Sequence, residues 1–109
     1  MTHKQVEKYI LSMAGAKLDY PFGEDVAVYK VKDKMFALIQ EKKEPVRLSL
    51  KCDPLLAETL RQKYESVLPG YHLNKKHWNT IILSGQLSDQ EVKDLILHSY
   101  TLIAGIEKA

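Results

Sequence analysis

The sequence predicts an α+β domain in which an antiparallel sheet packs against helices. Runs of β-forming residues are joined by short polar turns, which favours antiparallel pairing. Segments with helical spacing stand at both ends of the chain and between the runs. The 109 residues, 45% of them hydrophobic and 28% charged, suffice for one hydrophobic core but not for two. We therefore expect a single domain over residues 1–109, with the element order α-β-β-β-α-β-β-α.

The first helix is expected over residues 2–14. Thr2 and Gln5 have the spacing of a capping box, in which each side chain accepts a hydrogen bond from the other's backbone. Gly15 is a natural stop for this helix. Its apolar residues recur at helical spacing: Val6, Tyr9, Ile10 and Met13. Residues 18–23 follow as an ordered loop with apolar anchors.

Three strands are expected next, over residues 26–32, 35–41 and 46–52. The middle strand is apolar on both faces, as expected of a strand that is covered on both sides. In the third, Val46, Leu48, Leu50 and Cys52 alternate with Arg47, Ser49 and Lys51. This alternation predicts a half-buried strand whose polar residues point outward.

The second half of the chain predicts two helices and two more strands. Asp53 and Pro54 start a helix as an N-cap and first-turn pair, and Pro69-Gly70 ends it. Strands follow over 71–73 and 78–83. Ser88 and Glu91 form a second capping box before the last helix. The apolar stripe of the first of these helices is Leu56, Leu60, Tyr64 and Leu68; that of the second is Val92, Leu95, Ile96, Ser99, Leu102, Ile103 and Ile106.

Catalytic and metal-binding signatures are missing from the sequence. No nucleophile motif and no glycine-rich phosphate loop is present, and the inward position of Cys52 predicts a buried structural thiol. The four histidines, His3, His72, His77 and His98, lack metal-ligand spacing. We expect no enzyme, no metal and no cofactor; an active site or small-ligand site would require a pocket around Tyr71, His72 and His77.

The location is expected to be cytoplasmic. The longest apolar stretches are far shorter than the ~20 residues that cross a bilayer, so no membrane association is expected. The N-terminal residues lack the apolar core of a signal peptide. A single cysteine cannot form an internal disulfide, so nothing indicates an oxidising compartment.

Positive charge is concentrated on the predicted strands. Net charge is only +2, but residues 26–52 hold seven basic side chains against three acidic ones. Such segregation can produce a local electropositive surface. Lysines on strands also protect sheet edges from aggregation, which is a sufficient structural explanation. The seven are Lys30, Lys32, Lys34, Lys42, Lys43, Arg47 and Lys51.

A second polar segment, residues 72–80, concentrates Asn74, Lys75, Lys76, His77 and the only tryptophan, Trp78. Ammonium, amide and hydroxyl donors are the groups that contact phosphates, and an aromatic ring can stack on a base. The structural alternatives are a solvated turn held by Asn74 and a buried Trp78. For Trp78 we favour the buried position.

The chain resembles the MmcQ/YjbR-like family along its length. The similarity lies in several blocks in the same order: 20–25, 28–31, 34–37, 48–54, 69–80, 94–96 and 99–100. The resemblance implies a CyaY-like α+β fold with a "double wing" of strands and hairpins. It also implies DNA binding, the description usually attached to the family.

The leading functional expectation is a non-enzymatic DNA-binding domain that contacts mainly phosphates. Its candidate residues are Arg47, Lys51, Asn74, Lys75, Lys76, His77 and Trp78. Three to five phosphate contacts would give a slope of roughly −3 to −4.5 in log K against log salt. The alternative is a protein- or peptide-interaction domain that uses the sheet face or an edge, which a concave apolar surface would favour.

Overall fold

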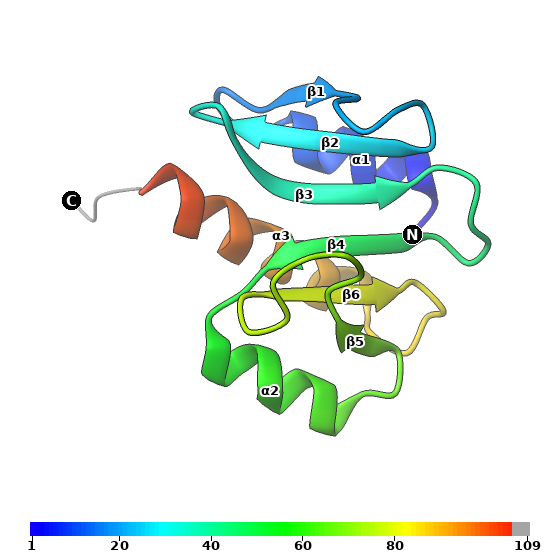
Figure 1. The fold of residues 1–109 in the computed structure, drawn as a ribbon. Coiled ribbons are helices and arrows are strands. Elements are labelled where there is room, and N and C mark those ends of the chain that lie inside the picture. Colours follow the sequence, from blue (N-terminus) through cyan, green and yellow to red (C-terminus); the bar gives the residue numbers. More distant parts are fainter. Residues whose placement is uncertain (106–109) are drawn as a thin grey trace.

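A computed structural model describes residues 1–105, which form one antiparallel six-stranded sheet and three helices (Figure 1). The strand order across the sheet is β1-β2-β3-β4-β6-β5. Along the chain the elements are α1 (His3–Leu11), β1 (Lys17–Asp19), β2 (Val26–Val31), β3 (Lys34–Gln40), β4 (Arg47–Lys51), α2 (Pro54–Lys63), β5 (Val67–Pro69), β6 (Trp78–Ile82) and α3 (Asp89–Ala104). The predicted α+β class with an antiparallel sheet is confirmed.

The two faces of the sheet differ in what covers them. Helices α1 and α3 lie behind the sheet in Figure 1, and α2 lies beside β5 and β6. The loop between β5 and β6, residues 70–77, crosses in front of the opposite face. We call the face behind which α1 and α3 lie the helix-covered face, and the opposite face the helix-free face. Among the described residues, no helix has the length and apolar character that a bilayer crossing requires.

The main core lies on the helix-covered face, between the sheet and the helices α1 and α3, and all of them contribute side chains to it. A β-bulge enlarges it. Tyr29 pairs with Ala37 and Lys30 with Met35, so Phe36 has no partner on β2. A bulge of this kind turns two successive side chains to one face, and both Phe36 and Ala37 belong to the main core. The Phe36 ring meets Tyr100 of α3 edge-on, with centroids 5.4 Å apart.

The helix starts follow the sequence closely. Both predicted capping boxes form, Thr2 with Gln5 and Ser88 with Glu91. The Asp53 carboxylate accepts hydrogen bonds from two backbone N–H groups of α2. The ends are less accurate, because α1 stops at Leu11, well before the predicted stop at Gly15.

One strand was absent from the predicted order. Lys17–Asp19 forms β1 and pairs with β2, in a region interpreted above as a loop. All three of its residues are exposed, so no apolar alternation marks the strand. Its backbone hydrogen bonds to β2 define it, and the sequence does not encode these locally.

Residues 64–73 also differ from expectation. The α2 helix ends at Lys63 and not near Leu68, because Tyr64 is already extended. Val67 then starts β5 and is buried opposite Ile81. Residues 71–73 form a turn, not a strand. Val67 is buried and Leu68 is exposed, so the apolar pattern here belongs to a strand.

Near the C-terminal end of α3, the buried residues differ from those predicted. Leu102 is exposed, whereas Tyr100 and Ala104 are buried in the main core. The phenol of Tyr100 donates a hydrogen bond to the carbonyl oxygen of Ala14, which explains why a polar tip is tolerated there. Ile106, also predicted on this face, lies outside the described residues.

Candidate functional site

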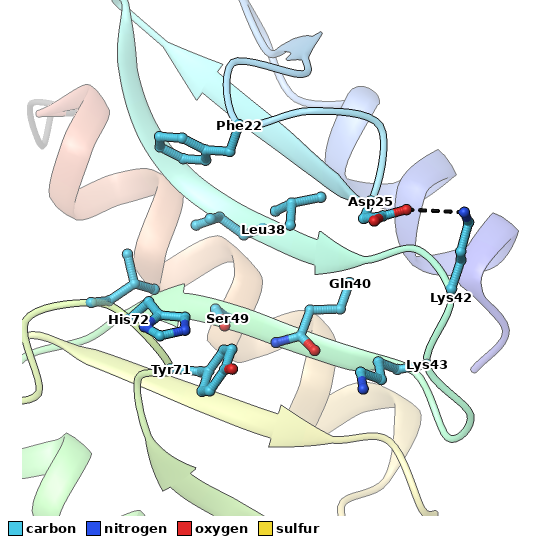
Figure 2. Close-up of a pocket in the computed structure, with 11 residues that line it drawn as sticks. Phe22, Asp25, Leu38, Gln40, Lys42, Lys43, Ser49, Tyr71 and His72 are labelled. Atoms are coloured by element: carbon cyan, nitrogen blue, oxygen red, sulfur yellow. Dashed lines mark ion pairs between the residues drawn. The ribbon is translucent and has the colours of Figure 1, made fainter.

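A cavity of about 490 Å³ lies on the helix-free face of the sheet (Figure 2). We call it the trough. Its floor is apolar: Leu38 belongs to a small second core of the protein, and Val26 and Leu73 pack against that core. The full lining is Phe22, Asp25, Val26, Leu38, Gln40, Lys42, Lys43, Ser49, Tyr71, His72 and Leu73. Its size falls within the range of small-ligand sites.

Aromatic rings stand on opposite walls of the trough. Figure 2 shows Phe22 on one side of Leu38, with His72 and Tyr71 on the other. Phe22 is 64% exposed and Tyr71 is 60% exposed, which is unusual for large apolar side chains. The Tyr71 and His72 rings lie 4.0 Å apart, centroid to centroid. Rings that are left in solvent around a concave surface are typical of a binding site.

Gly70 fixes the wall that carries Tyr71. A Cβ at this position would come within 2.7 Å of the Cβ of Trp78, so only glycine permits this close approach. The Gly70 N–H donates to the Trp78 carbonyl oxygen, and the Tyr71 N–H donates to the Thr80 hydroxyl. The backbone of Tyr71 is therefore held against the sheet, while its ring remains exposed to solvent.

The loop that carries Phe22 is fixed at both ends. The Gly23 N–H donates to the Tyr20 carbonyl oxygen, and Glu41 N–H donates to that of Asp25. Gly23 has a φ of +102°, a conformation that favours glycine. The two walls thus come from short, locally hydrogen-bonded turns on a rigid sheet.

Polar groups lie at the other end of the trough. Figure 2 places Lys42, Lys43 and Asp25 on the side away from Phe22 and His72, with Gln40 between. Lys42 is paired with Asp25 at 3.1 Å, whereas Lys43 has no ion-pair partner within the described part of the chain. The trough therefore has an aromatic end and a cationic end, with an amide at its centre.

The predicted cations Arg47 and Lys51 both project from the helix-free face. Arg47 lies opposite Gln40 and Ile82, and Lys51 lies opposite Trp78. They are four residues apart on one strand, which places them about 13 Å apart along it. Neither forms an ion pair with any residue from 1 to 105. Ser49, between them, was expected to point to solvent, but it is buried, sharing a 2.8 Å hydrogen bond with Thr80.

The second predicted segment lies in the loop 70–77. The side-chain oxygen of Asn74 accepts a hydrogen bond from the backbone N–H of Lys76, so Asn74 holds the turn. The ammonium group of Lys75 donates to the Gly70 carbonyl oxygen at 3.1 Å, whereas Lys76 is exposed. The backbone of His77 accepts a hydrogen bond from Cys52 N–H, which brings this loop to the Lys51 end of β4.

Trp78 is 8% exposed and packs with Val28 and Leu38 in the second core. The favoured prediction of a core anchor is confirmed, and the Trp78 ring is not open to stacking. The exposed rings of this face are Phe22 and Tyr71 instead. Phe22 was recognised in the sequence only as part of an ordered loop; its neighbour Gly23 hinted at a tight turn, but exposure cannot be read from sequence.

Three cations of the predicted basic group are engaged elsewhere. Lys30 pairs with Asp19 at 3.2 Å, and Lys42 pairs with Asp25. The ammonium group of Lys32 donates to the carbonyl oxygen of Ala104 at the end of α3, a common way to satisfy a helix C-terminus. The unpaired cations on or beside the helix-free face are thus fewer than the sequence indicated.

The only cysteine of the chain does not line the trough. Cys52 is buried, as predicted, and burial raises the pKa of its thiol to about 11. A thiol that stays protonated is a poor nucleophile. Within residues 1–105, no cluster of three or more potential metal ligands is found. His72 lines the trough, but His77 does not.

Residues 11–102 match the family model described as YjbR. The chain is 37% identical to uncharacterised protein YjbR of Escherichia coli K12 over 92% of this chain and 85% of that one. A crystal structure of a Deinococcus radiodurans protein described as a DUF419 domain superposes with a TM-score of 0.91, at 37% identity, covering 98% of this chain and 83% of that chain. A Pseudomonas syringae crystal structure follows at TM-score 0.80 and 32% identity, covering 94% and 99%.

Proposed function

The chain belongs to the YjbR family, and for this member we propose a non-enzymatic, cytoplasmic DNA-binding role centred on the helix-free face of the sheet. Its close relative in Escherichia coli is described as uncharacterised, so the support comes from geometry. Phosphate contacts would come from Arg47 and Lys51, with Lys75 and Lys76 from the adjoining loop.

One observation carries the proposal. Arg47 and Lys51 project from the same face, which no helix covers, and neither has a carboxylate partner among residues 1–105. An unpaired cation on an open surface is free to replace the counterions of a phosphate backbone. Lys43, at the cationic end of the trough, adds a third cation without an ion-pair partner among residues 1–105.

A second candidate, binding of a polypeptide segment, is favoured by the apolar floor of the trough. Leu38 and Leu73 form a concave surface of the kind that holds an aliphatic or aromatic side chain. The face supports this better than the edges. Both edge strands, β1 and β5, have three residues, and β5 ends in Pro69, which limits strand addition.

The test is charge reversal on the helix-free face. Arg47→Glu with Lys51→Glu should abolish retention of a labelled DNA oligonucleotide, measured by fluorescence anisotropy at about 50 mM salt. For the wild-type protein, three to four contacts predict a slope of roughly −2.7 to −3.6 in log K against log salt. Circular dichroism would check that the variant is folded.

The matched control is Lys4→Glu with Lys8→Glu. Both lysines are exposed on α1, in the opposite layer, and the change in net charge is the same. Equal loss in the two variants would mean that only net charge matters and would refute a defined interface. Absence of binding at low salt would refute DNA binding. Salt-independent binding of a peptide with a negative heat-capacity change would support the second candidate.

A further inference from the structure

The trough is the feature that phosphate contacts do not explain. Its aromatic walls and apolar floor would gain nothing from a phosphate oxygen, since such groups prefer charged and polar donors. A helix-free face used only for backbone contacts needs cations, not exposed rings. Phe22 and Tyr71 nevertheless remain in solvent on either side of the same concave surface.

From this arrangement we propose that the trough binds an unpaired nucleobase, so that the protein prefers single-stranded nucleic acid to duplex. The inference rests on the proposed function and specifies which form of the ligand is bound. Bases in a duplex are stacked on one another, and their faces are inaccessible to a side chain. An unpaired base presents both faces, which is what two opposing walls of aromatic rings can contact.

The distribution of groups along the trough matches a nucleotide. Phe22, Tyr71 and His72 surround the aromatic end, where a flat ring would be stacked. Lys43 lies at the other end and would meet the phosphate attached to that base. The cavity volume of about 490 Å³ leaves room for one nucleotide together with water.

The polar groups between the two ends suit the edge of a base. Gln40 extends from β3 into the middle of the trough, and its amide carries both a donor and an acceptor. Such an amide forms paired hydrogen bonds with base edges. Asp25, the acidic residue of the lining, is paired with Lys42, so its charge is compensated and does not repel a phosphate.

The cations outside the trough define a path for the rest of the strand. Arg47 lies opposite the trough residue Gln40, and Lys51 lies about 13 Å from Arg47 along β4, beside the loop that carries Lys76. A single strand that places one base in the trough can therefore reach unpaired cations on both sides. The positions of the cations and of the aromatic rings both favour a single-stranded nucleic acid with one base in the trough.

The experiment compares four probes by fluorescence anisotropy and competition at low salt. They are a single strand of about ten nucleotides, the same strand with abasic residues throughout, the corresponding duplex, and thymidine monophosphate. The wild-type protein should bind the single strand more tightly than the abasic strand and the duplex. Thymidine monophosphate should compete only weakly, because it lacks the flanking phosphates.

The decisive variants are Phe22→Leu and Tyr71→Leu, which keep an apolar side chain but remove the ring. Each should weaken single-strand binding by roughly 5- to 150-fold and leave the abasic and duplex probes unchanged. Phe22→Tyr should restore the wild-type affinity. Leu55→Ala is the matched control, since Leu55 is 77% exposed on α2, away from the trough.

The outcomes separate the two proposals. If single, abasic and duplex strands bind equally and both Leu variants bind like wild type, the nucleobase site is refuted while phosphate binding stands. If the mononucleotide binds as tightly as the strand, the preference for single strands is refuted. If no probe binds at low salt, the proposed function fails together with this inference.

Discussion

The two faces of the sheet are built from the same strands but serve different ends. The helix-covered face holds the main core, with Tyr29, Phe36 and Ile39 fully buried beneath α1 and α3. The helix-free face holds a small core of Val28, Leu38 and Trp78, covered in part by the loop 70–77. Most of the buried apolar core therefore lies on the helix-covered face, and the solvent-accessible rings and cations of the trough lie on the helix-free face.

This difference shows how a thin domain can combine stability with an open surface. Hydrophobic stabilisation scales with the apolar area removed from water, and the helices supply that area on one side alone. The small second core needs to fix only β6 and its loop, because the strands beneath are already held. The exposed rings of Phe22 and Tyr71 are therefore not needed to fill either core.

The largest expected effect comes from Phe36→Ala on the helix-covered face. Phe36 is fully buried and packs against Tyr100, so truncation leaves a cavity. We expect the free energy of unfolding to fall by about 3–5 kcal/mol, measured by urea denaturation. A loss below about 1 kcal/mol would contradict the assignment of the main core to this face.

Ser99→Ala should have the next largest effect, since the Ser99 hydroxyl links α3 to two strands. It donates to the Phe36 carbonyl oxygen at 2.5 Å and accepts from the Lys51 N–H at 3.0 Å. Its removal leaves two backbone groups without partners, at about 1–3 kcal/mol. Ser99→Thr keeps the hydroxyl but adds a methyl group, so a smaller loss for Thr would identify the hydrogen bonds as the cause.

The sequence predicts the helix-covered face better than the helix-free face, for a physical reason. Periodic apolar residues and caps such as Ser88 with Glu91 are local signals. They predict the helices and also the main strands. The strand β1 carries no such signal, because its pairing with β2 alone defines it. Likewise, the exposure of Phe22 depends on two turns meeting across the sheet. Arg47 and Lys51, by contrast, share a strand, so alternation alone predicted their common face.

The free energy of unfolding should depend on pH through the buried thiol of Cys52. Burial raises the pKa of the Cys52 thiol from its ordinary value of 9.0 to about 11. The folded state then binds this proton more tightly than the unfolded chain does, so the contribution is complete below about pH 9 and is lost as pH rises toward 11. The loss amounts to about 2 kcal/mol.

Cys52→Ala removes this titration. Between about pH 8 and pH 11 the wild-type protein should lose more stability than the variant, by about 2 kcal/mol in urea denaturation. Both proteins keep a second contribution of the same sign, because burial and Glu7 raise the pKa of Tyr29. Parallel loss in the two proteins would show that the Cys52 thiol titrates as an exposed group does.

The smallest effect on stability is expected from Phe22→Ala, which makes the comparison between faces direct. The chain has two phenylalanines, and Phe22 on the helix-free face is 64% exposed. Its truncation removes little buried area, so the free energy of unfolding should change by no more than about 0.5 kcal/mol. If Phe22→Ala instead costs as much as Phe36→Ala, the ring is structural and the trough loses its wall. A neutral effect on unfolding leaves binding as the reason to keep a phenylalanine in solvent.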